Sequence, residues 1–211
     1  RLLGPTIAAA IPELGCRTLD DLPGATPVSP CSLSPSDLAF VQFSSGTTAD
    51  PKPVALTQEA VILQARILLD ALLGAWPEDE HGPQSGLSWL PLYHDMGLIG
   101  CVFPPLLKRR DLTLLGPELF IAKPMTWLRA LSDYKATMST APNFAYGLCV
   151  HKVKDEEMEG VDLSSWHVAL NGAEPISLST MEDFGRRFSK WGFKPTAMTA
   201  VYGLSEASLA V

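Results

Sequence analysis

Five short segments of this 211-residue chain hold side chains whose types and order could do chemistry. The first, 44–52, places hydroxyl residues and one glycine ahead of Lys52. Hydroxyls and backbone amides of such a loop can surround phosphate oxygens, and a lysine adds a positive charge. A Walker A loop is excluded because Pro53 follows the lysine, and no G-x-G-x-x-G fingerprint occurs anywhere in the chain. By itself the segment is more simply explained as a polar turn with a solvated lysine.

The second segment follows the apolar residues 89–92 and begins with His94. At the carboxyl end of a strand this imidazole could meet a charged substrate, although a lone histidine near an apolar helix is more often structural. Asp95 is simply explained as the cap of the following helix. Met96 and the apolar residues after it suit either a core or an apolar tunnel, and the local sequence favours a core.

Three later segments add small, aromatic and acidic residues. Residues 141–146 hold an asparagine and two aromatic rings, which could line an apolar pocket or belong to the core. Residues 171–175 include the small residues Gly172 and Ala173, which would let a flat ligand approach the backbone. A turn that contains a glycine explains them equally well. In the last segment Tyr202 could stack on a base, Ser205 could contact a phosphate, and Glu206 could hold Mg²⁺ or remain a solvated acid.

An alternation of short apolar runs and amphipathic stretches supplies the elements that would position these segments. The apolar runs predict strands at 38–43, 87–90, 112–115, 136–140, 167–170 and 196–202. The amphipathic stretches predict helices at 58–73, 96–107, 124–134, 142–152 and 179–192, the first capped by Thr57 and the last with a capping box at Ser179–Glu182. Such alternation predicts an α/β fold with a mostly parallel, helix-covered sheet. Ligands bind such sheets beyond the carboxyl ends of the strands, where the five segments lie.

Composition limits the range of functions. The formal net charge of −7 makes nucleic acid an unfavourable partner, because phosphate contacts need clustered Lys and Arg. We find no apolar run that could span a bilayer as a transmembrane segment and no signal peptide. The four cysteines have neither metal-binding nor redox spacing, which favours a reducing, cytoplasmic location. Prolines interrupt residues 1–36, which we expect to form an irregular lead-in to a domain over 37–211.

The order of the five segments resembles the motifs of the acyl-adenylate-forming (AMP-binding) enzyme superfamily, which includes acyl-CoA synthetases, luciferases and the adenylation domains of peptide synthetases. The resemblance rests on Phe43-Ser44-Ser45-Gly46-Thr47-Thr48, Asn171-Gly172-Ala173-Glu174 and Tyr202-Gly203-Leu204-Ser205-Glu206. The run Trp89-Leu90-Pro91-Leu92-Tyr93-His94-Asp95-Met96-Gly97 is most similar to the fatty acyl-AMP ligase branch. The resemblance covers the chain from about Leu38 to its end.

The resemblance implies a role for each matching residue. The ATP β- and γ-phosphates would be held by Ser44, Ser45, Gly46, Thr47, Thr48 and Lys52. The adenine would be bracketed by Asn171, Gly172, Ala173, Glu174, Tyr202 and Gly203. The α-phosphate would meet Ser205, where the family usually has threonine, and Mg²⁺ would bind Glu206. The acyl substrate and its tunnel would meet His94, Met96, Gly97, Asn143, Phe144 and Tyr146. The catalytic set would be His94, Lys52, Ser205 and Glu206. Ala49 and Pro53 stand where relatives often have glycine, which implies a stiffer phosphate loop.

By this resemblance the protein is expected to join a fatty acid to ATP, with Mg²⁺ as cofactor, giving an acyl-adenylate and pyrophosphate. The acyl group would then pass to the phosphopantetheine thiol of an acyl carrier protein, or to CoA if the protein is an acyl-CoA synthetase. Two other hypotheses are a non-catalytic binding or regulatory module, and a generic doubly wound domain in which Lys52, His94 and Glu206 do not converge. The resemblance also implies that the chain is a central fragment of an adenylation domain, without the ribose-binding segment or the carboxyl-terminal lid, and is inactive by itself.

Overall fold

The computed structural model describes residue 29 and residues 31–44 and 52–211. Contacts divide the chain into two compact units, Arg1–Leu33 and Ser34–Val211. Nearly all of the first unit, and with it most of the predicted lead-in over 1–36, lies outside the described residues. The domain boundary after residue 36 therefore stays a prediction, and the elements that follow all belong to the second unit.

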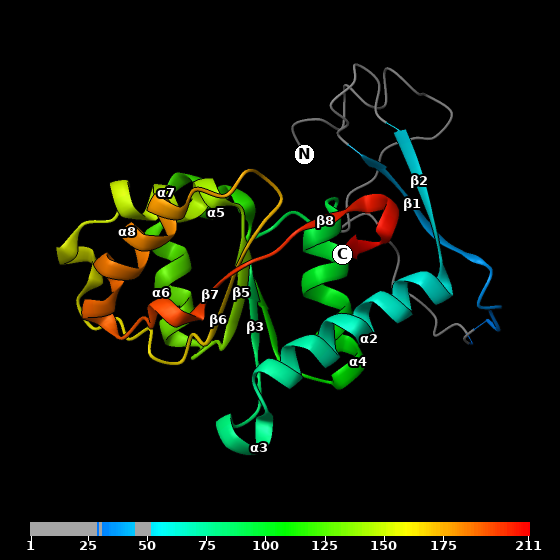
Figure 1. The fold of residues 1–211 in the computed structure, drawn as a ribbon, viewed down its shortest axis with the longest axis horizontal. Helices are drawn as coiled ribbons and strands as arrows, with labels where there is room; N and C mark the ends of the chain where they lie inside the picture. The colour runs from blue at the N-terminus through cyan, green and yellow to red at the C-terminus, as the bar shows by residue number, and fades with distance from the viewer. Residues whose placement is uncertain (1–28, 30, 45–51) are drawn as a thin grey trace. The chain divides into compact units, whose positions relative to one another are not determined.

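A five-stranded parallel sheet organises the second unit (Figure 1). Its strands lie in the order β4-β3-β5-β6-β7, with the bounds β3 Gly86–Ser88, β4 Leu112–Leu114, β5 Met138–Ala141, β6 Val168–Asn171 and β7 Met198–Ala200. Every neighbouring pair of these strands is parallel. The predicted α/β class, with a mostly parallel sheet covered by helices, is confirmed.

Helices cover both faces of this sheet. Between β3 and β4 the chain forms η2, a π-helix at Met96–Val102, and then α4 (Phe103–Lys108). Between β4 and β5 it forms α5 (Pro117–Ala122) and α6 (Met125–Asp133). The helix α7 (Asn143–Lys152) connects β5 to β6, and α8 (Leu178–Phe188) lies between β6 and β7. Figure 1 shows α6, α7 and α8 on one face and α2 (Gln58–Ala75) with α4 on the other. The chain leaves β3 toward one edge of the sheet and β5 toward the other, so a topological switch point lies between these two strands.

Two antiparallel hairpins stand outside the parallel sheet. β1 (Leu38–Ser44) pairs with β2 (Lys52–Thr57), and β8 (Gly203–Leu204) pairs with β9 (Leu209–Ala210). The predicted strand over 38–43 is confirmed, but its expected place in the parallel sheet is wrong. β2 has no counterpart among the predicted elements, although burial alternates along it: Val54 and Leu56 are buried while Ala55 is exposed.

Capping side chains begin α2 and α8, and one of these caps differs from the sequence prediction. Thr57 accepts a hydrogen bond from the Ala60 amide at 3.2 Å and so begins α2, as predicted. In α8, however, the cap is Ser177, whose hydroxyl accepts from the Thr180 amide at 3.3 Å. The capping box predicted at Ser179–Glu182 is therefore wrong, and the helix begins one residue earlier than expected.

The predicted helix over 96–107 consists of two helices, η2 followed by α4. Pro104 and Pro105 occupy the first turn of α4, where a missing N–H costs no hydrogen bond. The prolines therefore lie in the first turn of α4, and the change from η2 to α4 falls directly before them. The remaining short elements are α3 (Glu78–His81) and the 3₁₀ turns η3 (Asp155–Met158), η4 (Ser189–Trp191), η5 (Pro195–Ala197) and η6 (Ser205–Ala207).

An aromatic core packs α6, α7 and α8 against the sheet. Trp127, Tyr146 and Trp166 are fully buried in it. The ring centroid of Trp127 lies 5.5 Å from that of Tyr146 and 5.2 Å from that of Trp166. Trp127 Nε1 donates a hydrogen bond to Ser139 Oγ at 3.0 Å, and Tyr146 Oη donates one to the Leu170 carbonyl at 2.8 Å. Both buried polar groups are therefore satisfied, and both tie a helix to a strand.

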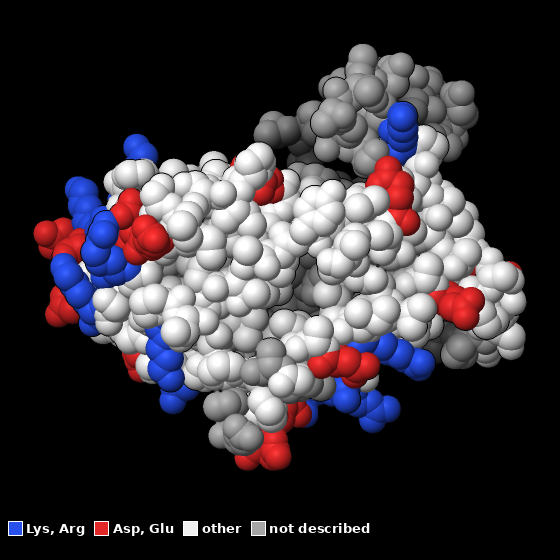
Figure 2. All heavy atoms as spheres, in the orientation of Figure 1, with Lys and Arg blue, Asp and Glu red and all other residues white. Residues whose placement is uncertain are grey.

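Charged side chains of both signs lie on the face drawn in Figure 2, and many of them gather over the α7 and α8 side. On that side of the sheet, Arg187 contacts Asp155 at 3.1 Å and Lys123 contacts Glu157 at 3.5 Å. Exposed pairs of this kind stabilise a fold by roughly 0–1 kcal/mol each. Within residues 29, 31–44 and 52–211, no helix is both long and apolar enough to cross a membrane.

Candidate functional site

A cavity of about 260 Å³ lies beyond the carboxyl ends of β5 and β6, beside the switch point of the sheet. Loops that follow three different strands form its walls. These loops bring together the predicted site residues His94, Met96, Ala173, Tyr202, Gly203 and Ser205. The cavity therefore lies where ligands bind in sheets of this topology.

Asp95 joins two of these loops. Its carboxylate accepts a hydrogen bond from Ser205 Oγ at 2.5 Å, 110 residues further along the chain, and lies 2.7 Å from His94 Nδ1. The Met96 amide lies 2.7 Å from Asp95 Oδ1 and 3.2 Å from His94 Nδ1. Because the amide donates to the nearer atom, Asp95 Oδ1, the imidazole Nδ1 does not have to accept its hydrogen and can itself donate to Asp95. Asp95 is thus the helix cap that the sequence predicts, and it also holds His94 and Ser205 on one cavity. Sequence reasoning missed this second role, because nothing near Asp95 in the chain signals Ser205.

The three side chains change one another's ionisation. The hydrogen bond to Asp95 raises the pKa of His94, although partial burial of the ring opposes the shift. For Asp95 burial acts to raise the pKa, but hydrogen bonds from His94 and Ser205 outweigh it and the pKa is lowered. Because the pKa of Asp95 is lowered, this group stabilises the fold at pH values above the usual carboxyl pKa. Because the pKa of His94 is raised, this group stabilises the fold at pH values below the usual histidine pKa. The ion pair is therefore fully formed between these two limits, where His94 carries a positive charge.

Hydrogen bonds from β1 and α2 fix the loops around the cavity. Gln42 Nε2 donates to the Tyr93 carbonyl at 2.9 Å, directly before His94. Gln64 Nε2 donates to the Ala210 carbonyl at 3.1 Å, in β9, the strand that follows Ser205. The strand β2, which begins at Lys52, also contacts η6, the element that holds Ser205. The antiparallel hairpin is thereby placed against the site rather than inside the main sheet.

A smaller cavity of about 80 Å³ adjoins the first, on the face covered by α2 and α4. The two cavities share Leu72, Gly100, Thr140 and Leu170 as lining residues. Burial raises the pKa of the Cys101 thiol in the wall of the smaller cavity, so this group is neutral there. The larger cavity has a mixed lining that includes His94, Asp95 and Ser205, and we call it the polar cavity to distinguish it from the almost wholly apolar smaller one. Such a pair suits a ligand with a charged head and a hydrocarbon tail.

A third cavity, of about 580 Å³, lies between the loops that follow β6 and β7 and is lined by residues 173–176 and 200–203. Tyr202 is 71% exposed at this cavity, so its ring is available for stacking. Gly172 allows the two loops to meet, because a Cβ atom there would lie 2.8 Å from the Val201 carbonyl oxygen. The small residues that the sequence assigns to a flat ligand thus also serve the contact between loops.

Residues predicted for the acyl site and for the adenine site bond to each other and hold these loops to α7. Asn143 Oδ1 accepts hydrogen bonds from Asn171 Nδ2 at 3.2 Å and from the Ser177 amide at 3.1 Å. Glu174 Oε1 accepts from the Phe144 amide at 2.5 Å, near the N-terminus of α7. A carboxylate is favoured at that end of a helix by the helix dipole. Asn143 and Glu174 therefore have structural contacts of their own, whatever ligand binds beside them.

Other predicted residues lie away from the polar cavity or outside the described part of the chain. Ser45, Gly46, Thr47 and Thr48 fall in the undescribed segment, between Ser44 at the end of β1 and the exposed Lys52 at the start of β2. Tyr146 is fully buried in the core, and Phe144 is 45% exposed without lining the cavity. Glu206 is exposed directly after Ser205 and does not line the cavity either.

Gly97 serves close packing at the start of η2. A Cβ atom there would clash with the Pro91 carbonyl oxygen and lie 3.2 Å from Leu90 Cβ. We expect Gly97→Ala to lower the free energy of unfolding by about 1–3 kcal/mol, as overpacking does, and to displace His94. Urea unfolding measures the loss. Gly74→Ala is the matched control, because its Cβ atom would meet nothing within 4 Å and alanine favours the helix. Equal losses in both variants would contradict this explanation.

Comparison with known proteins gives one family. The family model described as AMP-binding enzyme matches residues 6–211. The chain is 41% identical over 178 residues to the medium-chain-fatty-acid–[acyl-carrier-protein] ligase TtuA of Teredinibacter turnerae, covering 84% of this chain and 27% of that protein. It is 37% identical over 203 residues to the probable long-chain-fatty-acid–AMP ligase FadD30 of Mycobacterium tuberculosis, covering 93% of this chain and 33% of that protein.

A solved structure agrees with these sequence matches. The fatty acyl-adenylate ligase of L. pneumophila, in complex with acyl adenylate and pyrophosphate, superposes with a TM-score of 0.80 at 39% identity. The match covers 87% of this chain and 31% of that one. The chain thus spans about a third or less of the length of the relatives that it matches.

Proposed function

Because the chain belongs to the AMP-binding enzyme family, we propose that the whole protein activates a fatty acid as its acyl-adenylate, with ATP as the second substrate. The observation that carries this proposal is the pair of adjoining cavities, one with His94, Asp95 and Ser205 in its wall and the other almost wholly apolar. A fatty acid has the same two parts, a carboxylate and a hydrocarbon chain. Burial of that chain would favour binding by about 0.8 kcal/mol per methylene.

Five residues that line the polar cavity have a place in this proposal. The adenine would stack on Tyr202 beside Ala173. The Ser205 hydroxyl, which donates to Asp95 in this structure, would turn its single proton to the α-phosphate when ATP binds. The fatty carboxylate would lie next to His94, whose positive charge Asp95 stabilises. Residues 44–48 and Lys52 would hold the outer phosphates, since β2 contacts η6.

The reaction itself needs little covalent chemistry from the protein. A carboxylate oxygen of the fatty acid attacks the α-phosphorus of ATP and forms a new P–O bond. The bond from this phosphorus to the bridging oxygen breaks, and pyrophosphate leaves with the electron pair. Both reactants are anions, so most of the task is to position them and to neutralise their repulsion. Protonated His94 and Lys52 are the cationic side chains that we assign to this task.

Magnesium would complete the charge balance. Mg²⁺ at nucleotide sites is usually held by one or two carboxylates together with phosphate oxygens. Within the described ranges, no group of three His, Cys, Asp or Glu side chains could hold a metal without such phosphates. Glu206, exposed directly after Ser205, fits the part of a single protein ligand. When bound, the ion would draw negative charge from the triphosphate.

The second half of the proposal concerns the acyl acceptor. The thiol of an acyl carrier protein's phosphopantetheine attacks the carbonyl carbon of the acyl-adenylate, and AMP leaves. We assign the carrier protein as acceptor because TtuA, a relative at 41% identity, is named as a carrier-protein ligase. CoA, which carries the same phosphopantetheine thiol, is the alternative acceptor.

A pyrophosphate-exchange assay of the whole protein tests the proposal. We expect exchange of labelled pyrophosphate into ATP that depends on a fatty acid, and transfer of the acyl group to a holo carrier protein in preference to CoA. Omission of the fatty acid is the control for each arm. Absence of exchange in a correctly folded protein would favour the non-catalytic module instead, and abundant CoA thioester would overturn the assigned acceptor. The 211-residue chain by itself is expected to show no exchange.

We also propose the reducing cytoplasm as the setting of this reaction. Among the described cysteines, Cys31, Cys101 and Cys149 are all free thiols. Free thiols persist where glutathione and thioredoxin keep them reduced.

A further inference from the structure

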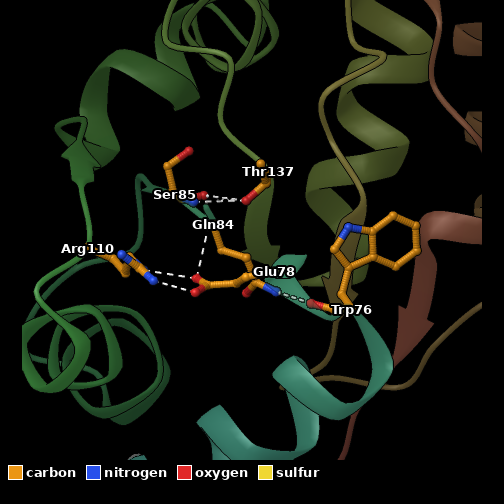
Figure 3. A network of polar contacts seen from close by, with 6 residues as sticks. All are labelled: Trp76, Glu78, Gln84, Ser85, Arg110 and Thr137. Atoms are coloured by element: carbon orange, nitrogen blue, oxygen red, sulfur yellow. Dashed lines mark hydrogen bonds and ion pairs between the residues drawn. The ribbon is translucent and has the colours of Figure 1, made fainter. Parts of the chain in front are cut away.

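The smaller, apolar cavity has one end at the polar cavity and the other at a polar network (Figure 3). At the first end the two cavities share lining residues from α2, η2, β5 and β6. Leu69, Leu87 and Leu112 contribute to the apolar wall between the ends. At the far end the lining residues include Glu78, Gln84 and Arg110.

Strand register shows that one end of the cavity lies at the carboxyl ends of the strands and the other at their amino ends. Gly86 pairs with both Leu112 and Met138, so the first residues of β3, β4 and β5 lie at one level. His94 follows the opposite, carboxyl end of β3. From Thr137 to Ala141 the backbone spans about 13 Å, at roughly 3.3 Å per residue. The cavity therefore runs under the sheet, along the strands, from the candidate reaction site toward their amino ends.

The network at the amino ends is closed by an ion pair. Arg110 Nε donates to Glu78 Oε1 at 2.9 Å, and a second guanidinium nitrogen contacts the other carboxylate oxygen. The Gln84 amide donates to Glu78 Oε1 at 3.3 Å, and Gln84 Nε2 donates to the Trp76 carbonyl at 2.6 Å. Figure 3 shows Glu78 between Arg110 on one side and Gln84 on the other. The pair thus connects α3 to the loop between α4 and β4.

This ion pair borders both the cavity and solvent. The side chain of Arg110 is 36% exposed and that of Glu78 is 27% exposed. A hydrocarbon chain that advanced past them would have to separate the two charges and press against at least one of them. Unpaired charges in contact with hydrocarbon are strongly unfavourable, whereas one more methylene gains little. The pair therefore opposes further entry of an acyl chain, although it contributes little to the fold itself.

We propose that the Glu78–Arg110 ion pair closes the far end of the acyl cavity and sets the longest fatty acid that the site accepts. This inference rests on the proposed function, because it assigns the apolar cavity to the acyl chain. Glu78 and Arg110 are specificity-determining residues here and take no part in the chemical step.

The test compares two double variants of the whole protein with the unaltered protein. Binding of saturated fatty acids, from octanoic to octadecanoic, is measured by calorimetry without ATP, and kcat/KM is measured by pyrophosphate exchange. In the unaltered protein we expect affinity to rise about fourfold per methylene and then to stop rising at one chain length. In Glu78→Ala/Arg110→Ala the rise should continue for at least two more methylenes, so that the longer acid binds about tenfold tighter or more. The reversed pair, Glu78→Arg/Arg110→Glu, should restore the original limit.

A matched ion pair outside the cavity serves as control. Arg186 and Asp183 form an exposed pair on α8, and Asp183→Ala/Arg186→Ala should leave the limit unchanged. An identical limit in Glu78→Ala/Arg110→Ala and the unaltered protein, with fatty acid bound by both, would overturn this inference and leave the proposed function intact. Failure of the unaltered protein to bind any fatty acid or to exchange pyrophosphate would overturn both.

Discussion

Replacing His94 with alanine in the whole protein lowers kcat/KM for fatty-acid-dependent pyrophosphate exchange by about 10²–10³-fold, the effect of removing one preorganised group that stabilises charge. His94 is the cationic side chain at the polar cavity, and Asp95 holds its ring at 2.7 Å. His151→Ala is the matched control, because this histidine is exposed on α7 and does not line the cavity. A loss below threefold in His94→Ala, or an equal loss in His151→Ala, would remove His94 from the catalytic set.

The charge on His94 can be tested separately from its presence. Asp95→Asn keeps one side-chain oxygen for the Met96 amide, places an NH₂ group that can donate to Ser205 Oγ where Oδ2 stands, and removes the negative charge beside the imidazole. We therefore expect the pKa of His94, followed by NMR titration, to fall toward or below its usual value. If protonated His94 assists the reaction, activity falls as the pH rises through the pKa of His94. In Asp95→Asn this pKa is lower, so we expect the fall in activity at lower pH. An unchanged pH profile alongside a lowered pKa would show that the imidazolium is not required.

The sheet was predictable because each of its strands is a short apolar run between helical stretches. Such runs are typical of strands in a parallel, helix-covered sheet, and the positions of β3 to β7 follow from them. β2 was harder, since Lys52-Pro53 resembles the end of a loop and only the alternation of Val54 and Leu56 indicates a strand. The start of α8 was mistaken because Ser177 and Ser179 are equally good caps by type, and packing decides between them.

The site was predictable only in part. Residues after strand ends could be expected to meet, and His94, Tyr202 and Ser205 do line one cavity. The hydrogen bond between Asp95 and Ser205 was not predictable, since it joins residues 110 positions apart. The position of Tyr146 was also undetermined, because an aromatic ring on α7 suits a pocket wall as well as the core. In the structure its hydroxyl bonds to the Leu170 carbonyl, which satisfies it inside the core.

The same core carries the largest expected effect on stability. Trp127→Ala should lower the free energy of unfolding by about 3–5 kcal/mol, the range for removal of a fully buried aromatic side chain. Trp127 stacks edge-on against Trp166 at 5.2 Å and donates to Ser139 Oγ, which in turn donates to the Leu87 carbonyl at 2.6 Å. The substitution therefore leaves a cavity against both β3 and β5, the strands that flank the switch point. For a domain that is stable by roughly 5–15 kcal/mol, this loss amounts to between about a fifth and all of the free energy of unfolding.

Trp191 provides a comparison at the edge of the same core. It is partly buried in η4, 6.0 Å from Phe188 by ring centroids, so Trp191→Ala removes less buried surface. We expect it to cost less than half as much as Trp127→Ala, because the loss scales with the buried area and the cavity that remains. Urea unfolding followed by far-ultraviolet circular dichroism measures both variants without depending on tryptophan fluorescence. Equal losses would mean that α6 does not anchor the sheet more firmly than η4 does, and that the position of the cavity depends on other contacts.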